Sequence, residues 1–326
     1  MLAYIGKRIL QFIPVFIGAT LILFFFRAVI PGDPIKLLAG EKAIPDAIYE
    51  QIVANKHLDE PMYIQYGYYM NDLLHGDLGT SYQRKTPVID IFAEKFPYTA
   101  RLALCAICVE IIIGLSAGII SAVRRYSFLD ALVTISTSVL VSVPVFWLGM
   151  LLQMFFGVFL KNVTGGFFSL PVSGAGGIIS EYPTWVHYIL PSITLASVSL
   201  AYTARIMRSQ LLEVMNADYI RTARAKGLSR SAVIFKHALK NAMIPVITFI
   251  GIDFGTMMSG AILTETIFNW PGIGWEIFKA IGQRDWPIVM GGVILVVLVV
   301  MLINLVIDIS YAFFDPRIRY GKKAGD

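Results

Sequence analysis

The sequence predicts an all-α membrane protein with six transmembrane helices and an outer helical segment between the first and second spans. Apolar residues make up 56% of the 326 residues and charged residues only 15%, which lies far outside the usage of soluble domains. A helix needs about 20 residues to cross the hydrocarbon core of a bilayer. Six apolar runs have roughly that length, at residues 9–30, 102–123, 132–156, 188–207, 242–263 and 288–314.

Basic residues predict the orientation of these spans. Sixteen Lys and Arg fall in the loops and tails of one side, whereas the short loops of the other side hold three, Lys161, Lys279 and Arg284. The long segment 31–100 is left out of this comparison because long loops cross the membrane regardless of charge. Both termini are therefore expected in the cytoplasm. The net charge of +5 reflects this topology, so we expect no nucleic-acid binding. The first run is too long for a cleaved signal and is expected to stay as a span.

A basic stretch between the fourth and fifth spans, residues 218–229, is the most informative hydrophilic segment. Asp218 suits the N-cap of a helix and Gly227 suits the left-handed residue after a helix end, so about two helical turns are predicted between them. Ile220, Ala223 and Gly227 share one smooth face. We expect this face to contact a protein partner while the charged side meets water or lipid phosphate.

Ionisable residues at membrane depth are candidates for function, and here they are Glu110, Asp253 and Asp308. A substrate path or a proton relay would need Glu110 and Asp253 on facing helices. Alternatively, each carboxyl is held by Ser, Thr, Asn or backbone groups, as Asn304 could hold Asp308 one helical turn away. The sequence leaves both interpretations open.

Several patterns argue against catalysis or metal binding by this chain. Residues 114–118 match the G-x-S-x-G pattern of hydrolases, but they lie in the middle of a span, so Gly114 and Gly118 are expected to form a helix-packing face. The four histidines lack metal-ligand spacing, and Cys105 and Cys108 are expected to act as small apolar residues. No G-x-x-x-x-G-K-[ST] occurs. We expect no catalytic residue, no metal and no nucleotide site.

The chain resembles an ABC importer permease of the dipeptide/oligopeptide/nickel branch over nearly its whole length. Residues 218–229 are similar to the cytoplasmic motif of that family. Five further segments match in the correct order: 31–34, 76–79, 237–245, 265–274 and 315–317.

The resemblance implies the type I ABC importer permease fold and the first permease of a pair. The expected divisions are 1–30 for the tail and first span, 31–100 for the extracytoplasmic segment, and 101–326 for the core permease domain with a coupling loop at 208–240. Implied partners are a second homologous permease, an extracytoplasmic substrate-binding protein and two cytoplasmic ABC ATPases. ATP and Mg²⁺ belong to those ATPases, and no cofactor to this chain. The expected ATPase-coupling residues are Asp218, Ile220, Arg221, Ala223, Arg224, Ala225 and Gly227, and the candidate translocation path contains Glu110 and Asp253.

The expected function is a multi-pass subunit of a prokaryotic inner membrane that forms, with the second permease, a path for di- and oligopeptides by alternating access. Uptake of nickel or glutathione by the same assembly is an alternative. The rival from another class is a proton-coupled transporter that uses Glu110 and Asp253. Its uptake would survive ATP depletion and collapse with the proton gradient.

Overall fold

The computed structural model describes residues 2–29, 45–55, 57–176, 180, 182–258 and 261–314. Within these ranges every regular element is a helix, and the one β-type pairing is an isolated bridge between Thr80 and Pro87. The chain forms two compact units. Unit 1 comprises Met1–Pro97 and Pro271–Asp326, and unit 2 comprises Tyr98–Trp270.

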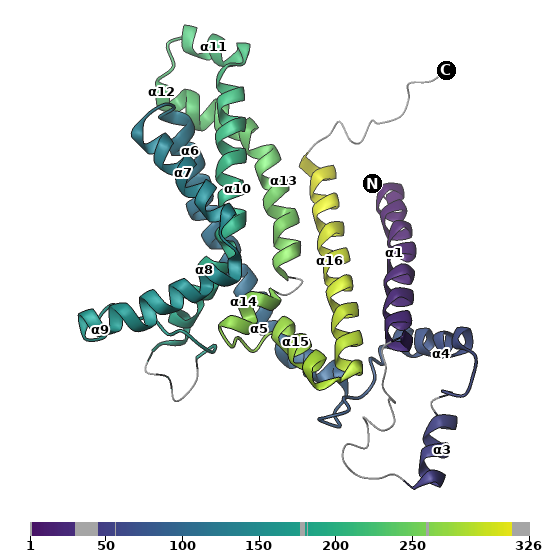
Figure 1. Cartoon of the computed structure of the whole chain (residues 1–326). Helices are drawn as coiled ribbons and strands as arrows, with labels where there is room; N and C mark the ends of the chain where they lie inside the picture. The colour runs from purple at the N-terminus through teal and green to yellow at the C-terminus, as the bar shows by residue number, and fades with distance from the viewer. Residues whose placement is uncertain are drawn as a thin grey trace, which may run out of the picture. The chain divides into compact units, whose positions relative to one another are not determined.

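Figure 1 labels most of the helices. Unit 1 contains α1 (Leu2–Val29), α3 (Asp46–Asn55), α4 (Met62–Leu74), the start of α5 (Val88–Val109), α15 (Ile273–Gln283) and α16 (Trp286–Phe314). Unit 2 continues from α5 through η1 (Glu110–Leu115), α6 (Ser116–Val123), α7 (Phe128–Ser142), α8 (Val145–Leu152), η2 (Gln153–Phe159), α9 (Leu160–Thr164), η3 (Thr184–Tyr188), α10 (Ile189–Met215), α11 (Asp218–Ala225), α12 (Arg230–Ala232), η4 (Val233–Ala238), α13 (Leu239–Met258) and α14 (Ile262–Ile267). The elements η1, η2 and η4 are π-helical, and η3 is a 3₁₀-helix.

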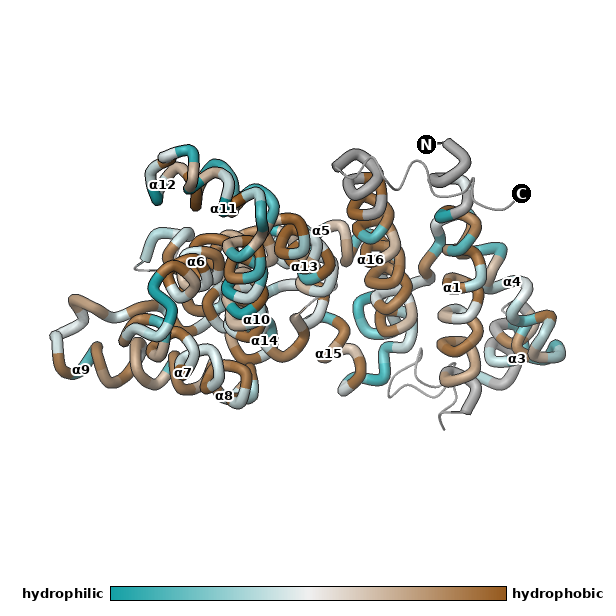
Figure 2. The backbone as a smooth tube through the Cα atoms, turned by 90° about the horizontal axis from the view of Figure 1, so that it is seen from above, coloured by the Kyte–Doolittle hydropathy of each residue, from teal (hydrophilic) through white to brown (hydrophobic). Residues whose placement is uncertain are grey.

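The predicted number of spans is confirmed. In the described part of the chain six helices are long and apolar enough to cross a membrane: Arg8–Phe26, Val88–Val123, Val145–Thr164, Thr184–Met215, Arg230–Met258 and Trp286–Ile307. Figure 2 shows hydrophobic residues along α16 and many hydrophilic residues over α11 and α12. The chain is therefore a multi-pass membrane protein.

Several predicted span boundaries are wrong. The second span was expected over 102–123, but its helix begins at Val88, and the fourth was expected over 188–207, but its helix runs from Thr184 to Met215. The third span was expected over 132–156, but the helix breaks between α7 and α8. Val143 has an extended conformation there (φ −88°, ψ 126°), because the ring of Pro144 disfavours helical geometry in the residue before it. The fifth span begins at Arg230 and ends at Met258, instead of running from 242 to 263.

The outer segment folds around the end of α1. The helical character predicted for this segment is confirmed by α3 and α4. The ring of Phe24 in α1 packs edge-on against Tyr66 of α4, with 5.5 Å between ring centroids. The hydroxyl oxygens of Thr20 and Tyr66 lie 2.9 Å apart. These contacts anchor α4 to α1, which itself lies beside α16 (Figure 1).

A buried apolar cluster joins α5, α15 and α16 in unit 1. Its members are Val88, Ile91, Phe92, Ile273, Ile277, Ala280 and Ile288. Gly292 of α16 permits this close approach, because a Cβ atom there would lie 2.5 Å from Cγ1 of Ile277. Helix α16 packs with α1 and α15 and falls with them in unit 1.

Helix α10 is the central helix of unit 2. It packs against η1, α6, α7, α8 and α13. In the apolar stretch of this span 61% is buried inside the protein, whereas at most 33% is buried in the corresponding stretch of the other described spans. Small buried residues such as Ala196, Ala201 and Ala204 let the neighbouring helices approach it closely.

The predicted packing face at Gly114 and Gly118 is confirmed. A Cβ atom on Gly114 would lie 3.1 Å from the carbonyl oxygen of Leu200, and one on Gly118 would lie 2.6 Å from that of Ala204. Both glycines therefore face α10 and bring η1 and α6 against it. The segments 31–34 and 315–317 and the side chain of Asp308 lie outside the residues that the structure describes.

Candidate ATPase-coupling site

The basic stretch 218–229, which holds the predicted ATPase-coupling residues, begins with helix α11, and α11 follows α10 at one end of unit 2 (Figure 1). Its predicted start is wrong by one residue. The N-cap is Ala217, whose side chain makes no capping hydrogen bond, and Asp218 is the first helical residue. A carboxylate in the first turn is still favourable there, because it lies near the positive end of the helix dipole.

Two residues of the smooth face of α11, Ile220 and Ala223, point into the protein, whereas the third, Gly227, is exposed. Ile220 is 0% exposed and Ala223 is 8% exposed. Both belong to the main apolar cluster of unit 2, together with Met207 and Leu211 of α10 and Val233 of η4. The expectation that Ile220 and Ala223 contact an ATPase is therefore corrected: in this structure they hold α11 against its own unit.

The opposite face of α11 is exposed. The side chain of Asp218 is 93% exposed and that of Arg221 69%, and the two are joined by an ion pair of 3.3 Å. Tyr219, Thr222, Arg224, Ala225 and Gly227 are also exposed. A surface ion pair of this kind contributes little to stability. These side chains are available to bind another protein.

Three polar contacts tie α11 and the following turn to other helices of unit 2. Asn241 Nδ2 of α13 donates to the hydroxyl of Tyr219 (2.8 Å). Arg224 Nη2 donates to the carbonyl oxygen of Met215 at the end of α10 (3.3 Å). Arg230 Nη2 donates to the carbonyl oxygen of Val123 at the end of α6 (3.0 Å). A force applied to α11 would therefore reach three separate helices.

A glycine turn follows α11, and a side-chain cap begins the next helix, α12. Gly227 has φ +80°, as predicted for the residue after the helix, and its amide donates to the carbonyl of Arg224 (3.0 Å). The next helix begins at Arg230, where the hydroxyl of Ser229 accepts from the amide of Ala232 (3.3 Å). Crowding does not require a glycine at this position, because a Cβ atom there would meet nothing within 4 Å. The left-handed φ does, because glycine adopts it without steric cost.

A charged network fixes the same end of unit 2. Arg208 of α10 donates through Nε to Asp130 Oδ1 (2.8 Å) and through Nη2 to Asp130 Oδ2 (2.9 Å). Asp130 of α7 also accepts from the hydroxyl of Ser121 and from the amide of Tyr126 (2.9 Å). The network joins α6, α7 and α10 around one buried carboxylate.

The environment of Asp130 explains its charge. The hydrogen bond from the Arg208 guanidinium, followed by the one from Ser121, holds the pKa of the Asp130 carboxyl well below its usual value. The group is therefore ionised at every physiological pH. This ion pair was not predicted from the sequence. The available signals were a short basic turn directly before Asp130 and the position of Arg208 at the basic end of the fourth span.

Glu110 and Asp253 lie on neighbouring helices, where Glu110 is fully buried and Asp253 is half-buried. Glu110 is 0% exposed in η1, and its Oε1 accepts from the hydroxyl of Thr203 in α10 (2.5 Å). Its carboxyl also contacts that of Asp253 in α13. One oxygen of each group, Oε2 and Oδ2, is buried and receives no hydrogen bond from a donor group.

Comparisons with known proteins agree with this architecture. A family described as "Binding-protein-dependent transport system inner membrane component" matches residues 114–320, and the N-terminal family that accompanies it matches residues 1–103. A solved structure titled "Crystal structure of an amino acid ABC transporter with histidines" has a TM-score of 0.50 and 13% sequence identity, covering 70% of this chain and 94% of its own.

Relatives that match nearly the whole chain have about two fifths of their aligned residues identical to it. The "Dipeptide transport system permease protein DppB" of Escherichia coli (strain K12) is 41% identical, covering 99% of this chain and 100% of the relative. The protein of the same name from Alkalihalophilus pseudofirmus is 42% identical over 98% of this chain, and the "Glutathione transport system permease protein GsiC" of Pectobacterium atrosepticum is 41% identical over 98%. The chain therefore belongs to the family of binding-protein-dependent transport system inner membrane components, which confirms its resemblance to ABC importer permeases of the type I fold.

Proposed function

We propose that this chain is the first of two permease subunits of an ATP-driven importer that carries di- and oligopeptides by alternating access. The names of its full-length relatives support this cargo. The proposed assembly contains a second permease, two cytoplasmic ABC ATPases that bind ATP and Mg²⁺, and an extracytoplasmic substrate-binding protein. In this proposal the ATPases, and not this chain, carry the catalytic residues. The charge bias of the loops supports cytoplasmic termini.

The observation that carries the mechanism is the two-sided character of α11. Its apolar face is buried with residues of α10 and η4, while Asp218, Arg221 and Ala225 are exposed on the other side. Closure of the ATPases would pull on the exposed side, and the contacts to α6, α10 and α13 would move these helices as one body. Ile220 and Ala223 act as the anchor of the lever in this proposal.

Site-directed cross-linking tests this assignment with a matched pair of residues on one helix. With Cys105 and Cys108 replaced by serine, Ala225→Cys should cross-link to a copurified ATPase, because residue 225 is exposed. Ala223→Cys, two residues earlier, should not, because residue 223 is buried. Equal cross-linking of both positions, or cross-linking from Ala223→Cys alone, would refute the orientation.

Transport in proteoliposomes tests the proposed function itself. Uptake of a radiolabelled dipeptide should require ATP on the side of the ATPases and the substrate-binding protein on the other side. It should survive a protonophore. Uptake that continues without ATP and stops with the protonophore would favour the proton-coupled rival. Competition by excess glutathione or nickel chelate would identify the alternative cargoes, for which the glutathione-transport relatives are the specific support.

Burial of Glu110 supports a structural role for the carboxyl pair. A group that lines an open path meets water, whereas Glu110 is enclosed by η1, α10 and α13. We propose that Glu110 and Asp253 hold these three helices together, with Thr203 as the donor from α10.

A further inference from the structure

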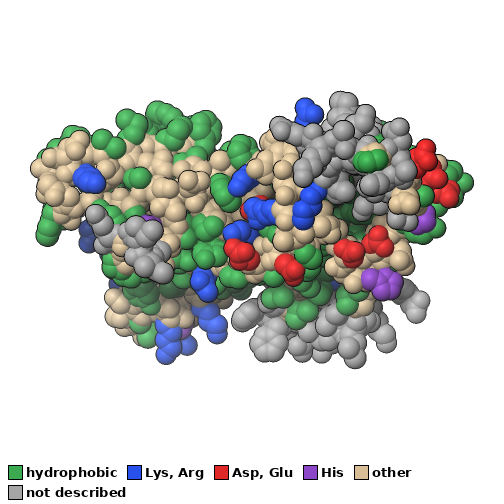
Figure 3. Space-filling view, turned by 90° about the horizontal axis from the view of Figure 1, so that it is seen from below, with side chains coloured by type: hydrophobic (Ala, Val, Ile, Leu, Met, Phe, Trp, Pro, Cys, Tyr) green, Lys and Arg blue, Asp and Glu red, His purple; other side chains and the backbone are tan. Residues whose placement is uncertain are grey.

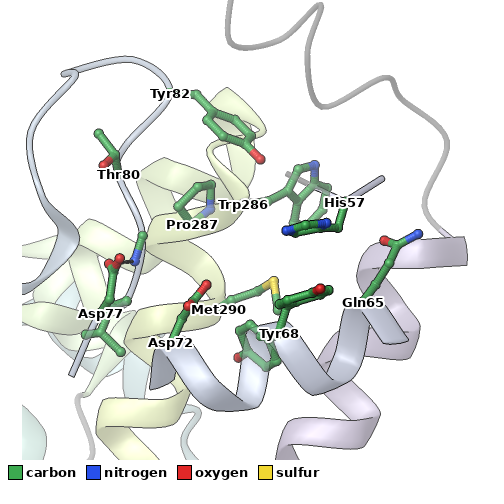
Figure 4. A pocket seen from close by; sticks show the side chains of 13 residues that line it. His57, Gln65, Tyr68, Asp72, Asp77, Thr80, Tyr82, Trp286, Pro287 and Met290 are labelled. Atoms are coloured by element: carbon green, nitrogen blue, oxygen red, sulfur yellow. Dashed lines mark hydrogen bonds between the residues drawn. The ribbon is translucent and has the colours of Figure 1, made fainter. Parts of the chain in front are cut away.

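Unit 1 contains a cavity of about 370 Å³ that the proposed mechanism does not use. Its walls come from the turn after α3, from α4, from the loop that follows α4, and from the first turns of α16 (Figure 4). This volume lies within the range of small-molecule sites, roughly 300–1,000 Å³. Such a size favours a whole small ligand over a single side chain of a docked protein.

The charge of the lining favours a cation. Asp72 and Asp77 both line the cavity, and none of the thirteen described residues that line it is Lys or Arg. Within the described parts of the chain, neither carboxylate forms an ion pair with Lys or Arg. The Asp77 carboxylate is oriented by the amide of Gly79, which donates to Oδ1 (2.7 Å). Figure 3 shows exposed acidic and histidine side chains on the part of the molecule that holds α3 and α4.

Aromatic rings line the same space. Tyr68, Tyr82 and Trp286 contribute to the walls, and Figure 4 shows their rings around the volume that Asp72 and Asp77 border. Faces of Trp and Tyr attract ammonium and guanidinium groups within about 6 Å. Two carboxylates beside the faces of aromatic rings suit an organic cation.

The walls are held in place by contacts within unit 1. His57 stacks on Tyr68 with 3.8 Å between ring centroids and 6° between planes. Gln65 Nε2 donates to the carbonyl oxygens of Leu58 (3.2 Å) and Glu60 (2.8 Å), which fixes the turn that carries His57.

The loop on the other wall is fixed in a similar way. Buried Asp285 accepts from Ser81 Oγ (2.5 Å) and from the amides of Tyr82 (3.0 Å) and Gln83 (3.2 Å). Little ordering of either wall would therefore be needed on binding.

We infer that this cavity binds the ammonium terminus of a short peptide, with the ammonium group between Asp72 and Asp77 and against the rings of Tyr68 and Trp286. The inference rests on the proposed peptide cargo. It gives the permease its own contact with the substrate, separate from the substrate-binding protein. An N-terminal ammonium is the feature that all unblocked peptides share, so this site would accept many sequences.

The test uses the full-length chain in lipid nanodiscs and radiolabelled Ala-Ala as the probe. Equilibrium dialysis should detect binding of Ala-Ala, and N-acetyl-Ala-Ala, which lacks the charge, should not compete. Asp72→Asn should weaken binding by about tenfold or more, the loss expected for a hydrogen bond to a charged group. Asp90→Asn is the matched control, because Asp90 is an exposed carboxylate of unit 1 outside the cavity. Ala-Ala should also change the tryptophan fluorescence of the native chain but not of Trp286→Phe.

Three results would overturn the inference. They are equal competition by the acetylated peptide, unchanged affinity in Asp72→Asn, and an effect of Asp72→Asn on binding of the substrate-binding protein without any effect on Ala-Ala. Thermal unfolding of the variant checks that it is folded. If the assembly imports dipeptides while the cavity binds none, the inference fails and the proposed function stands. If dipeptide uptake also fails, the proposed cargo is wrong as well.

Discussion

The Asp130–Arg208 pair offers the sharpest test of how the coupling end of unit 2 is held together. Asp130→Asn keeps the shape of the side chain but removes the charge that Arg208 contacts through two hydrogen bonds of 2.8 and 2.9 Å. Hydrogen bonds to charged groups contribute about 1.5–3 kcal/mol, and breaking a fully buried pair costs about 3–5 kcal/mol. The Arg208 side chain is 30% exposed, so water can solvate part of the orphaned guanidinium. We therefore expect a loss of about 2 kcal/mol.

The assay is the thermal unfolding midpoint of the purified protein, followed by tryptophan fluorescence. A loss of about 2 kcal/mol corresponds to a fall of about 4–8 °C for a domain of this size. Asp218→Asn is the control: its carboxylate is 93% exposed and its ion pair contributes little, so the midpoint should not move. The double variant with Arg208→Gln should unfold close to the single variants, because both remove the same interaction.

The pH dependence follows from the lowered pKa of Asp130. A group whose folded-state pKa is depressed stabilises the protein fully above its unfolded pKa of about 3.9, and loses that stabilisation as the pH falls toward the folded-state pKa. The difference between the native protein and Asp130→Asn should therefore be constant between about pH 5 and 8 and should shrink in stronger acid. A midpoint within 1 °C of the native value, additive single variants, or a difference that changes near neutral pH would refute the reasoning.

Three further predictions concern Gly227, Gly118 and Glu110. Gly227→Ala should destabilise the turn after α11 by about 1–2 kcal/mol, because φ is +80° there and not because of a clash. Transport should fall in this variant while ATP hydrolysis by the assembly continues. Gly227→Asn should retain more transport, because asparagine tolerates this φ better than alanine does. Gly118→Ala should lower the yield of folded protein, since its Cβ atom would lie 2.6 Å from the carbonyl oxygen of Ala204. Gly18→Ala is the control and should leave the yield unchanged, because its Cβ atom would meet nothing within 4 Å. Equal yields of the two variants would contradict the close packing on α10. Glu110→Gln should retain transport, because an amide can donate to Asp253. Glu110→Leu should lower the unfolding midpoint, because it leaves Thr203 and Asp253 without their partner. Loss of transport in Glu110→Gln at an unchanged midpoint would instead support a proton-carrying role.

Much of the fold could be predicted from the sequence because it depends on local properties. A run of about 20 apolar residues has to be a span, whatever its neighbours are. The number of spans, α3, α4, the glycine after α11 and the packing face at Gly114 and Gly118 all follow from composition and spacing over a few turns. The break at Pro144 also had a local signal, in the restriction that proline imposes on the residue before it.

The tertiary structure decided which surfaces and charges meet. A smooth face of small residues packs equally well on its own protein or on a partner, so spacing alone could not assign the inner face of α11; only its burial against α10 and η4 did. Asp130 and Arg208 are 78 residues apart, and Glu110 and Thr203 are 93 apart. Such contacts arise from helix packing, which no periodicity within one segment encodes. The sequence by itself determined a six-span permease with a basic helix between its fourth and fifth spans, and the packing of its helices determined which side of that basic helix faces outward.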